Sequence, residues 1–159
     1  MTSLQALAAQ VAARLQERGQ SIAVAESSAG GLINAALVAV PGASAYYIGG
    51  GIIYTGAARE ALLGIADAQM SGMRSASEPY ARLVARRVRE QLAATWGLAE
   101  TGASGPTGNR YGDAPGHACL AVSGPVELVT TLETGSADRE ANMRRFAHAA
   151  LELLLNAMR

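Results

Sequence analysis

Segments with apolar residues at helical spacing alternate with short apolar runs along this chain, and this alternation limits the fold more than any other feature. Helices are expected from Leu4 to Gly19, from Gly30 to Val40, from Ala57 to Leu63, from Ser77 to Gly97 and from Asp138 to Ala157. Strands are expected from Ser21 to Ala25, from Tyr46 to Thr55, from His117 to Val122 and from Val126 to Leu132. Such an alternation is typical of an α/β sandwich.

Composition narrows the class of protein. The 159 residues fit one domain, 1–159, and the net charge is zero, so nothing favours nucleic acid or a membrane surface as a partner. The apolar runs are too short to span a bilayer, and the start of the chain lacks a secretory signal. The single cysteine, Cys119, allows no internal disulfide, which favours a cytoplasmic protein. Two histidines and one cysteine form no metal-binding pattern, and all 13 basic residues are arginines.

The heptapeptide AESSAGG, Ala25 to Gly31, lies where the first strand is expected to lead into a helix. A helix start presents free backbone N–H groups, which attract an anion or a developing oxyanion. A serine at this corner could act as a nucleophile, and the glycines would let a ligand approach the backbone. The alternative is a well-capped, tightly packed turn with no chemistry.

Two other segments are candidates for function. The glycine-rich stretch from Thr101 to Gly116 is expected to be a loop of 16 residues, which is either functional or a mobile surface loop; it lacks a phosphate-loop lysine. Tyr54 ends an apolar strand and needs a polar partner for its hydroxyl. Four arginines on the long helix are interpreted as a solvated helix face, since no aromatic residues are interleaved with them: Arg82, Arg86, Arg87 and Arg89.

Several stretches, in order along nearly the whole chain, resemble the CinA C-terminal domain family. AESSAGG resembles the family's AESCTGG, and GGGIIYTGAAREALLGI resembles a segment of the form GGxVxYSNEAK followed by LLGV. TGASGPTGN, followed by DAPGHACLAV, resembles TGIAGPxGG followed by KPVGTV. Shorter similarities are PGAS at Pro41 to Ser44, ASEP at Ala76 to Pro79, and Ala137-Asp138-Arg139 before the last helix. The family's amino-terminal domain has no counterpart here, which is expected of a stand-alone form.

The resemblance implies an α/β/α sandwich around a mixed β-sheet, a homo-oligomer, and no metal or organic cofactor. It also implies hydrolysis of the carboxamide of nicotinamide mononucleotide to nicotinic acid mononucleotide and ammonia. In this chain the family's nucleophile falls on Ser27, its tyrosine on Tyr54 and its lysine on Arg59. The expected substrate-binding residues are Glu26, Ser28, Gly30, Gly31, Thr101, Gly102, Gly105, His117 and Arg139.

The chain departs from the family pattern at positions that matter for the reaction. Arg59 stands where the family has lysine, and a guanidinium does not give up its proton in proteins. Asp113 stands where the family has lysine, which reverses a charge near the expected pocket. His117 replaces a threonine and is an alternative base for Ser27. Two hypotheses remain: an amidohydrolase with a changed base, or a degenerate member that binds a nucleotide or its own subunits.

Overall fold

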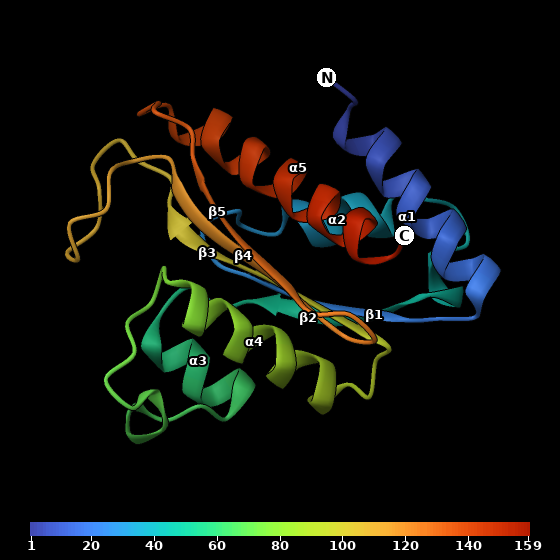
Figure 1. Cartoon of the computed structure of the whole chain (residues 1–159), viewed down its shortest axis with the longest axis horizontal. Helices are drawn as coiled ribbons and strands as arrows, with labels where there is room; N and C mark the ends of the chain where they lie inside the picture. Colours follow the sequence, from blue (N-terminus) through green and yellow to red (C-terminus); the bar gives the residue numbers. More distant parts are fainter.

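The computed structural model describes residues Met1–Arg159 and consists of one five-stranded sheet between two layers of helices (Figure 1). The elements, in chain order, are α1 (Leu4–Arg18), β1 (Ile22–Glu26), α2 (Leu32–Val38), η1 (Ala43–Ala45), β2 (Tyr47–Ile52), α3 (Gly56–Leu63), η2 (Asp67–Met70), α4 (Glu78–Gln91), β3 (Trp96–Ala103), β4 (His117–Ser123), β5 (Leu128–Glu133) and α5 (Arg139–Ala157). Helices α1, α2 and α5 cover one face of the sheet, and α3 and α4 cover the other. The expected α/β/α sandwich is confirmed.

The sheet is mixed, as expected. Its strand order is β2-β1-β3-β4-β5; β1 pairs in parallel with β2 and β3, whereas β3, β4 and β5 pair antiparallel. All five residues of β1 are buried, because helices cover both of its faces. Because β1, β2 and β3 are parallel, their carboxyl ends lie at the same edge of the sheet. The loop between β3 and β4 projects from this edge (Figure 1).

The region between residues 91 and 103 differs from the expectation. Helix α4 ends at Gln91, and Gly97 lies inside β3, a central strand that the sequence analysis missed. A Cβ atom on Gly97 would lie 2.1 Å from the Ala85 carbonyl oxygen, so glycine here allows α4 to pack directly on the sheet. The expected glycine-rich loop is also shorter, since its first three residues belong to β3.

The start of α2 also differs. The helix begins at Leu32, and Gly30 and Gly31 precede it with φ angles of 68° and 101°. Both glycines form a left-handed turn rather than the first turn of the helix, because residues with side chains are strained in this conformation.

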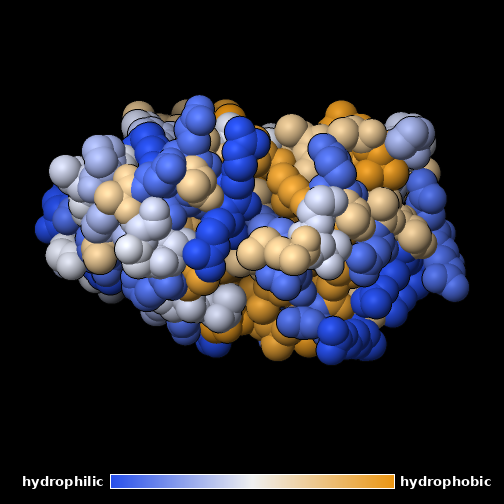
Figure 2. Space-filling model, turned by 90° about the horizontal axis from the view of Figure 1, so that it is seen from above, coloured by the Kyte–Doolittle hydropathy of each residue, from blue (hydrophilic) through white to orange (hydrophobic).

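The outer face of the upper helical layer has no uniform character. Viewed from above, hydrophilic side chains are interspersed with smaller hydrophobic areas (Figure 2). None of the helices combines the length and the apolar character that crossing a membrane requires.

Candidate active site

A pocket of about 250 Å³ lies at the carboxyl ends of the three parallel strands. In sheets with parallel strands, ligands commonly bind at this edge. The pocket is lined by Ser27, Ile53, Tyr54, Thr55, Gly56, Arg59, Ser75, Ala76, Tyr80, Thr101, Gly102, Asn109 and Tyr111. Five of the expected site residues therefore meet here: Ser27, Tyr54, Arg59, Thr101 and Gly102. The others, Glu26, Ser28, Gly30, Gly31, Gly105, His117 and Arg139, do not line the pocket.

Ser27 is the first residue after β1 and is half-buried at the pocket. Its backbone N–H donates to a Glu100 carboxylate oxygen at 2.9 Å. Its hydroxyl makes no hydrogen bond within the chain, although it lines a pocket rich in polar groups. The Ser27 hydroxyl is therefore held in place by its backbone and left available to a ligand.

Glu26 closes the start of α2 from inside the protein. Its fully buried carboxylate accepts hydrogen bonds from the backbone N–H groups of Gly31 and Ile33, each at 3.1 Å, and of Asn34 at 2.8 Å. Burial raises the pKa of Glu26, although these hydrogen bonds oppose the shift. The N–H groups that the sequence analysis assigned to an oxyanion are thus occupied by a side chain, and Glu26 holds the turn instead of contacting the pocket.

Glu100, which the sequence analysis missed, holds the other half of the same turn. It lies on β3 and accepts hydrogen bonds from the N–H groups of Ser27 and Ala29, at 2.9 and 2.8 Å, and from the Ser28 hydroxyl. Its side chain is buried, and burial raises its pKa to about 7 despite these three donors. The expected role of Ser28 in binding substrate is replaced by this internal hydrogen bond. An isolated acidic residue in an apolar stretch was the available sign, but no strand was expected there.

Tyr54 and Arg139 form a bridge across one rim of the pocket. Arg139 donates to the Tyr54 hydroxyl oxygen at 2.9 Å and to the Gly105 carbonyl oxygen. This contact joins the segment after β2 to the start of α5 and to the loop after β3. Arg139 and Gly105 therefore reach the site through Tyr54, whose side chain is largely exposed.

Arg59 is buried in the pocket wall. Its Nε donates to the Ile65 carbonyl oxygen at 2.9 Å, and its Nη2 donates to the Asp67 carboxylate. The positive charge at the family's lysine position is thus retained beside Ser27, but with a group that cannot accept a proton.

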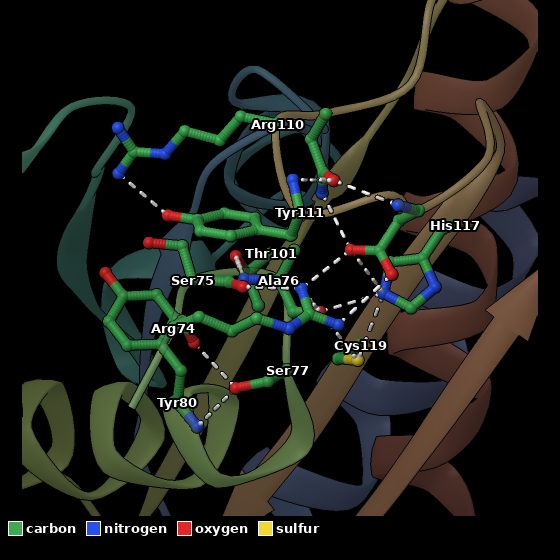
Figure 3. Close-up of polar contacts among 12 residues, drawn as sticks. Arg74, Ser75, Ala76, Ser77, Tyr80, Thr101, Arg110, Tyr111, His117 and Cys119 are labelled. Carbon is green, nitrogen blue, oxygen red and sulfur yellow. Dashed lines mark hydrogen bonds and ion pairs between the residues drawn. The ribbon is translucent and has the colours of Figure 1, made fainter. Parts of the chain in front are cut away.

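His117 has no free ring nitrogen. Nε2 lies 2.8 Å from the Ala76 carbonyl oxygen (Figure 3). Nδ1 contacts the Glu133 carboxylate. Burial opposes a charged ring, but these acceptors and the nearby Asp113 raise the pKa of His117. Both ring nitrogens are therefore engaged with oxygen atoms inside the protein. This placement does not support His117 as the base for Ser27.

Ala76, between His117 and the pocket, is held from two sides. It has a φ angle of 56°, which is uncommon for a residue other than glycine. Its N–H donates to the Thr101 hydroxyl oxygen at 3.0 Å, and its carbonyl accepts from His117. The Cys119 sulfur lies 3.6 Å behind the same carbonyl, and burial raises the pKa of this thiol. These contacts fix a strained residue in the pocket wall.

The charge-reversed position, Asp113, ties the long loop to the segment before α4. Arg74 makes two hydrogen bonds to Asp113, at 2.7 and 3.1 Å, and lies over the Tyr111 ring. Arg110 lies on the same ring at 5.0 Å from its centroid (Figure 3). Asp113 therefore serves to place Tyr111 at the pocket. No three His, Cys, Asp or Glu side chains are grouped in a way that could hold a metal ion.

The sequence of this chain is similar to those of known proteins. It is 39% identical over 149 residues to a CinA-like protein of Anaeromyxobacter dehalogenans, a match that covers 94% of this chain and 36% of that relative. It is also 39% identical over 150 residues to a CinA-like protein of Gloeobacter violaceus, covering 93% of this chain and 35% of the relative. The chain thus spans about a third of the length of these curated relatives.

Solved structures agree with this similarity. The competence/damage inducible protein CihA from Agrobacterium tumefaciens superposes with a TM-score of 0.92 at 25% identity, covering 100% of this chain and 98% of that one. A CinA superfamily protein from Enterobacter cloacae also gives a TM-score of 0.92 at 25% identity, covering 100% of this chain and 94% of that one. The model of the CinA C-terminal domain matches residues 4–158. The chain belongs to the CinA C-terminal domain family.

Proposed function

We propose that this chain hydrolyses the carboxamide of a pyridine mononucleotide, converting nicotinamide mononucleotide and water to nicotinic acid mononucleotide and ammonia. The observation that carries the proposal is the Ser27 hydroxyl, which lines a polar pocket and makes no hydrogen bond within the chain. In the proposed reaction, Ser27 Oγ bonds to the carboxamide carbon and the C–N bond breaks to release ammonia. Water then cleaves the acyl–serine ester and restores the hydroxyl.

The charges around the pocket suit an anionic nucleotide. Arg59 lies in the wall, Arg110 stacks on Tyr111, and Arg139 bonds to Tyr54. Arg110 and Arg139 form no ion pair with an acidic side chain, so their charges remain available to a phosphate. The start of α2, where an anion was expected, is closed by the Glu26 carboxylate and is not part of the proposed phosphate site.

The pocket also favours slow turnover. No neutral lysine or free histidine stands beside Ser27, and Arg59 remains protonated. Arg59 can stabilise negative charge in the transition state but cannot take the hydroxyl proton. General-base assistance is typically worth about 10²–10⁴-fold, and we expect the wild-type rate to lack it.

Nicotinamide mononucleotide is expected to raise the melting temperature, whereas nicotinamide, which lacks the phosphate, is not. A ligand at about 100 times its Kd stabilises by about 2.7 kcal/mol, which corresponds to roughly 5–10 °C for a chain of this size. Differential scanning fluorimetry measures the shift. Arg110→Ala or Arg139→Ala should reduce it, while Arg144→Ala, an exposed arginine on α5, should not. Equal shifts from both compounds would contradict a mononucleotide site.

Slow ammonia release from nicotinamide mononucleotide is expected to depend on Ser27. Ser27→Ala removes the attacking oxygen and should bring release to the uncatalysed level. Ser44→Ala is the matched control, because Ser44 is exposed in η1, before the opposite end of β2. Coupled detection of ammonia, with chromatography of nicotinic acid mononucleotide, provides the measurement. Release that is unchanged in Ser27→Ala would remove the serine from the mechanism.

A second function has an observation in its favour: a binding module without turnover. Glu26 and Glu100 occupy five backbone N–H groups of the turn around Ser27, which leaves little of an oxyanion-binding site. A melting-temperature shift with nicotinamide mononucleotide, combined with no detectable ammonia, would support this function over hydrolysis.

A further inference from the structure

The candidate pocket is lined without any acidic side chain. Its 13 lining residues include hydroxyl-bearing side chains, one asparagine and Arg59, but neither aspartate nor glutamate. Glu26 and Glu100 lie behind the turn at Ser27, where their carboxylates accept internal hydrogen bonds. A carboxylate ligand only accepts hydrogen bonds, whereas a carboxamide also needs acceptors for its NH₂ group. The lining therefore suits a carboxylate better than a carboxamide.

Arg59 presents unused hydrogen-bond donors to this pocket. Its side chain is 7% exposed, and Nε and Nη2 donate to Ile65 and Asp67, whereas Nη1 donates to no group of the protein. Because no fully buried side-chain nitrogen or oxygen lacks a partner, Nη1 has access to solvent, and the cavity that Arg59 lines provides it. Asp67 is 97% exposed, so water screens its charge and the charge of Arg59 is only partly neutralised.

Tyr80, on α4, presents a second unused donor. It is 5% exposed and lines the pocket, yet its hydroxyl makes no hydrogen bond within the chain. Burial raises the pKa of Tyr80, so the hydroxyl stays protonated at neutral pH and can donate; the nearby charge of Arg59 opposes this shift. The hydroxyl groups of Ser75, Tyr80 and Tyr111, which all line the pocket, point to the same side (Figure 3).

We propose that Arg59 and Tyr80 form a carboxylate-binding subsite, so that the pocket holds a pyridine mononucleotide with a ring carboxylate more tightly than one with a ring carboxamide. The inference rests on the proposed function only for the identity of the nucleotide. A carboxylate loses more hydration than a carboxamide on entering the pocket, and its charge-assisted hydrogen bonds to Arg59 offset this loss. In the proposed reaction, nicotinic acid mononucleotide would leave slowly.

Isothermal titration calorimetry with the two nucleotides at pH 7.5 tests the subsite, because their shared ribose phosphate cancels in the ratio of Kd values. Wild type should bind nicotinic acid mononucleotide about tenfold more tightly than nicotinamide mononucleotide. Arg59→Gln should bring the ratio close to one, and Tyr80→Phe should lower it roughly threefold. Arg87→Gln is the matched control, because Arg87 also donates to backbone carbonyls but does not line the pocket, and it should keep the wild-type ratio.

Circular dichroism shows which variants are folded, and Tyr80→Phe, which removes one oxygen, retains the test if Arg59→Gln does not fold. Equal Kd values in wild type, or an unchanged ratio in the folded variants, would overturn the proposal, as would loss of the preference in Arg87→Gln.

A second pair of probes separates the subsite from the proposed function. If neither nucleotide binds, the mononucleotide function fails, and nicotinate and nicotinamide at millimolar concentration, followed by NMR, test the subsite alone. Binding of nicotinate in preference to nicotinamide would support it, and equal binding or none would overturn it.

Discussion

Arg59→Lys is expected to raise ammonia release from nicotinamide mononucleotide by about 10²–10⁴-fold, the usual value of general-base assistance. The Arg59 side chain is buried in the wall of the pocket that contains Ser27. Burial lowers the pKa of a lysine amine, so a fraction is neutral and can accept the serine proton. The steady-state rate of wild type and Arg59→Lys at pH 7–9 measures the gain.

Two further variants assign the gain to this mechanism. Ser27→Ala in the Arg59→Lys background should abolish it. Asp67→Asn in the same background should add a smaller gain near neutral pH, because a carboxylate that contacts residue 59 raises the pKa of an amine there. If Arg59→Lys binds the nucleotide but releases no ammonia, residue 59 is not the only barrier to turnover and the binding-module function is favoured.

Glu100→Ala is expected to lower the free energy of unfolding by roughly 3–5 kcal/mol, because it leaves three buried donors without an acceptor at about 1–3 kcal/mol each. The donors are the N–H groups of Ser27 and Ala29 and the Ser28 hydroxyl. Glu100→Gln should cost much less, since its amide oxygen can accept both N–H groups and its NH₂ can donate to Ser28. Urea unfolding measures both values, and equal losses would contradict this account.

The same carboxyl group makes stability depend on pH. Its pKa is raised from 4.5 to about 7 in the folded protein. The contribution to stability is therefore fully present below about pH 4.5 and is lost as the pH rises through about 7, a change of about 3 kcal/mol. Relative to Glu100→Gln, wild type should lose this amount between pH 4.5 and 8. Parallel pH profiles for the two proteins would contradict a buried, titrating Glu100.

The helices and most strands follow from local patterns in the sequence. Helix α1 has regular apolar spacing and ends at Gly19, and both were expected. Strand β3 could not be recognised in the same way, because Gly97, Glu100 and Thr101 resemble loop residues when read locally. Their places are set by tertiary contacts: Gly97 by α4 and Glu100 by the turn after β1. A central strand can contain such residues when distant parts of the chain satisfy them.

The candidate site likewise contains residues that the sequence predicted and contacts that it could not predict. The resemblance to a family singled out Ser27, Tyr54 and Arg59. In the structure all three line one pocket. The partners of Glu26, Glu100 and His117 depend on packing between separate elements, which neither spacing nor composition reveals. For this reason the sequence did not reveal that the N–H groups near Ser27 are already hydrogen-bonded. A helix start has the same sequence pattern whether a ligand or a carboxylate side chain accepts hydrogen bonds from its N–H groups.

The position of Cys119 allows motion near the pocket wall to be followed without introducing another cysteine. Cys119 is 1% exposed, its sulfur lies 3.6 Å from the Ala76 carbonyl oxygen, and it is the only cysteine in the chain. A disulfide reagent can reach this sulfur only when the elements packed around it, which include the segment carrying Ala76 and strand β5, separate, so the labelling rate of the native protein reports those openings. The reaction rate of this native cysteine therefore serves as a measure of how often the structure next to the pocket opens.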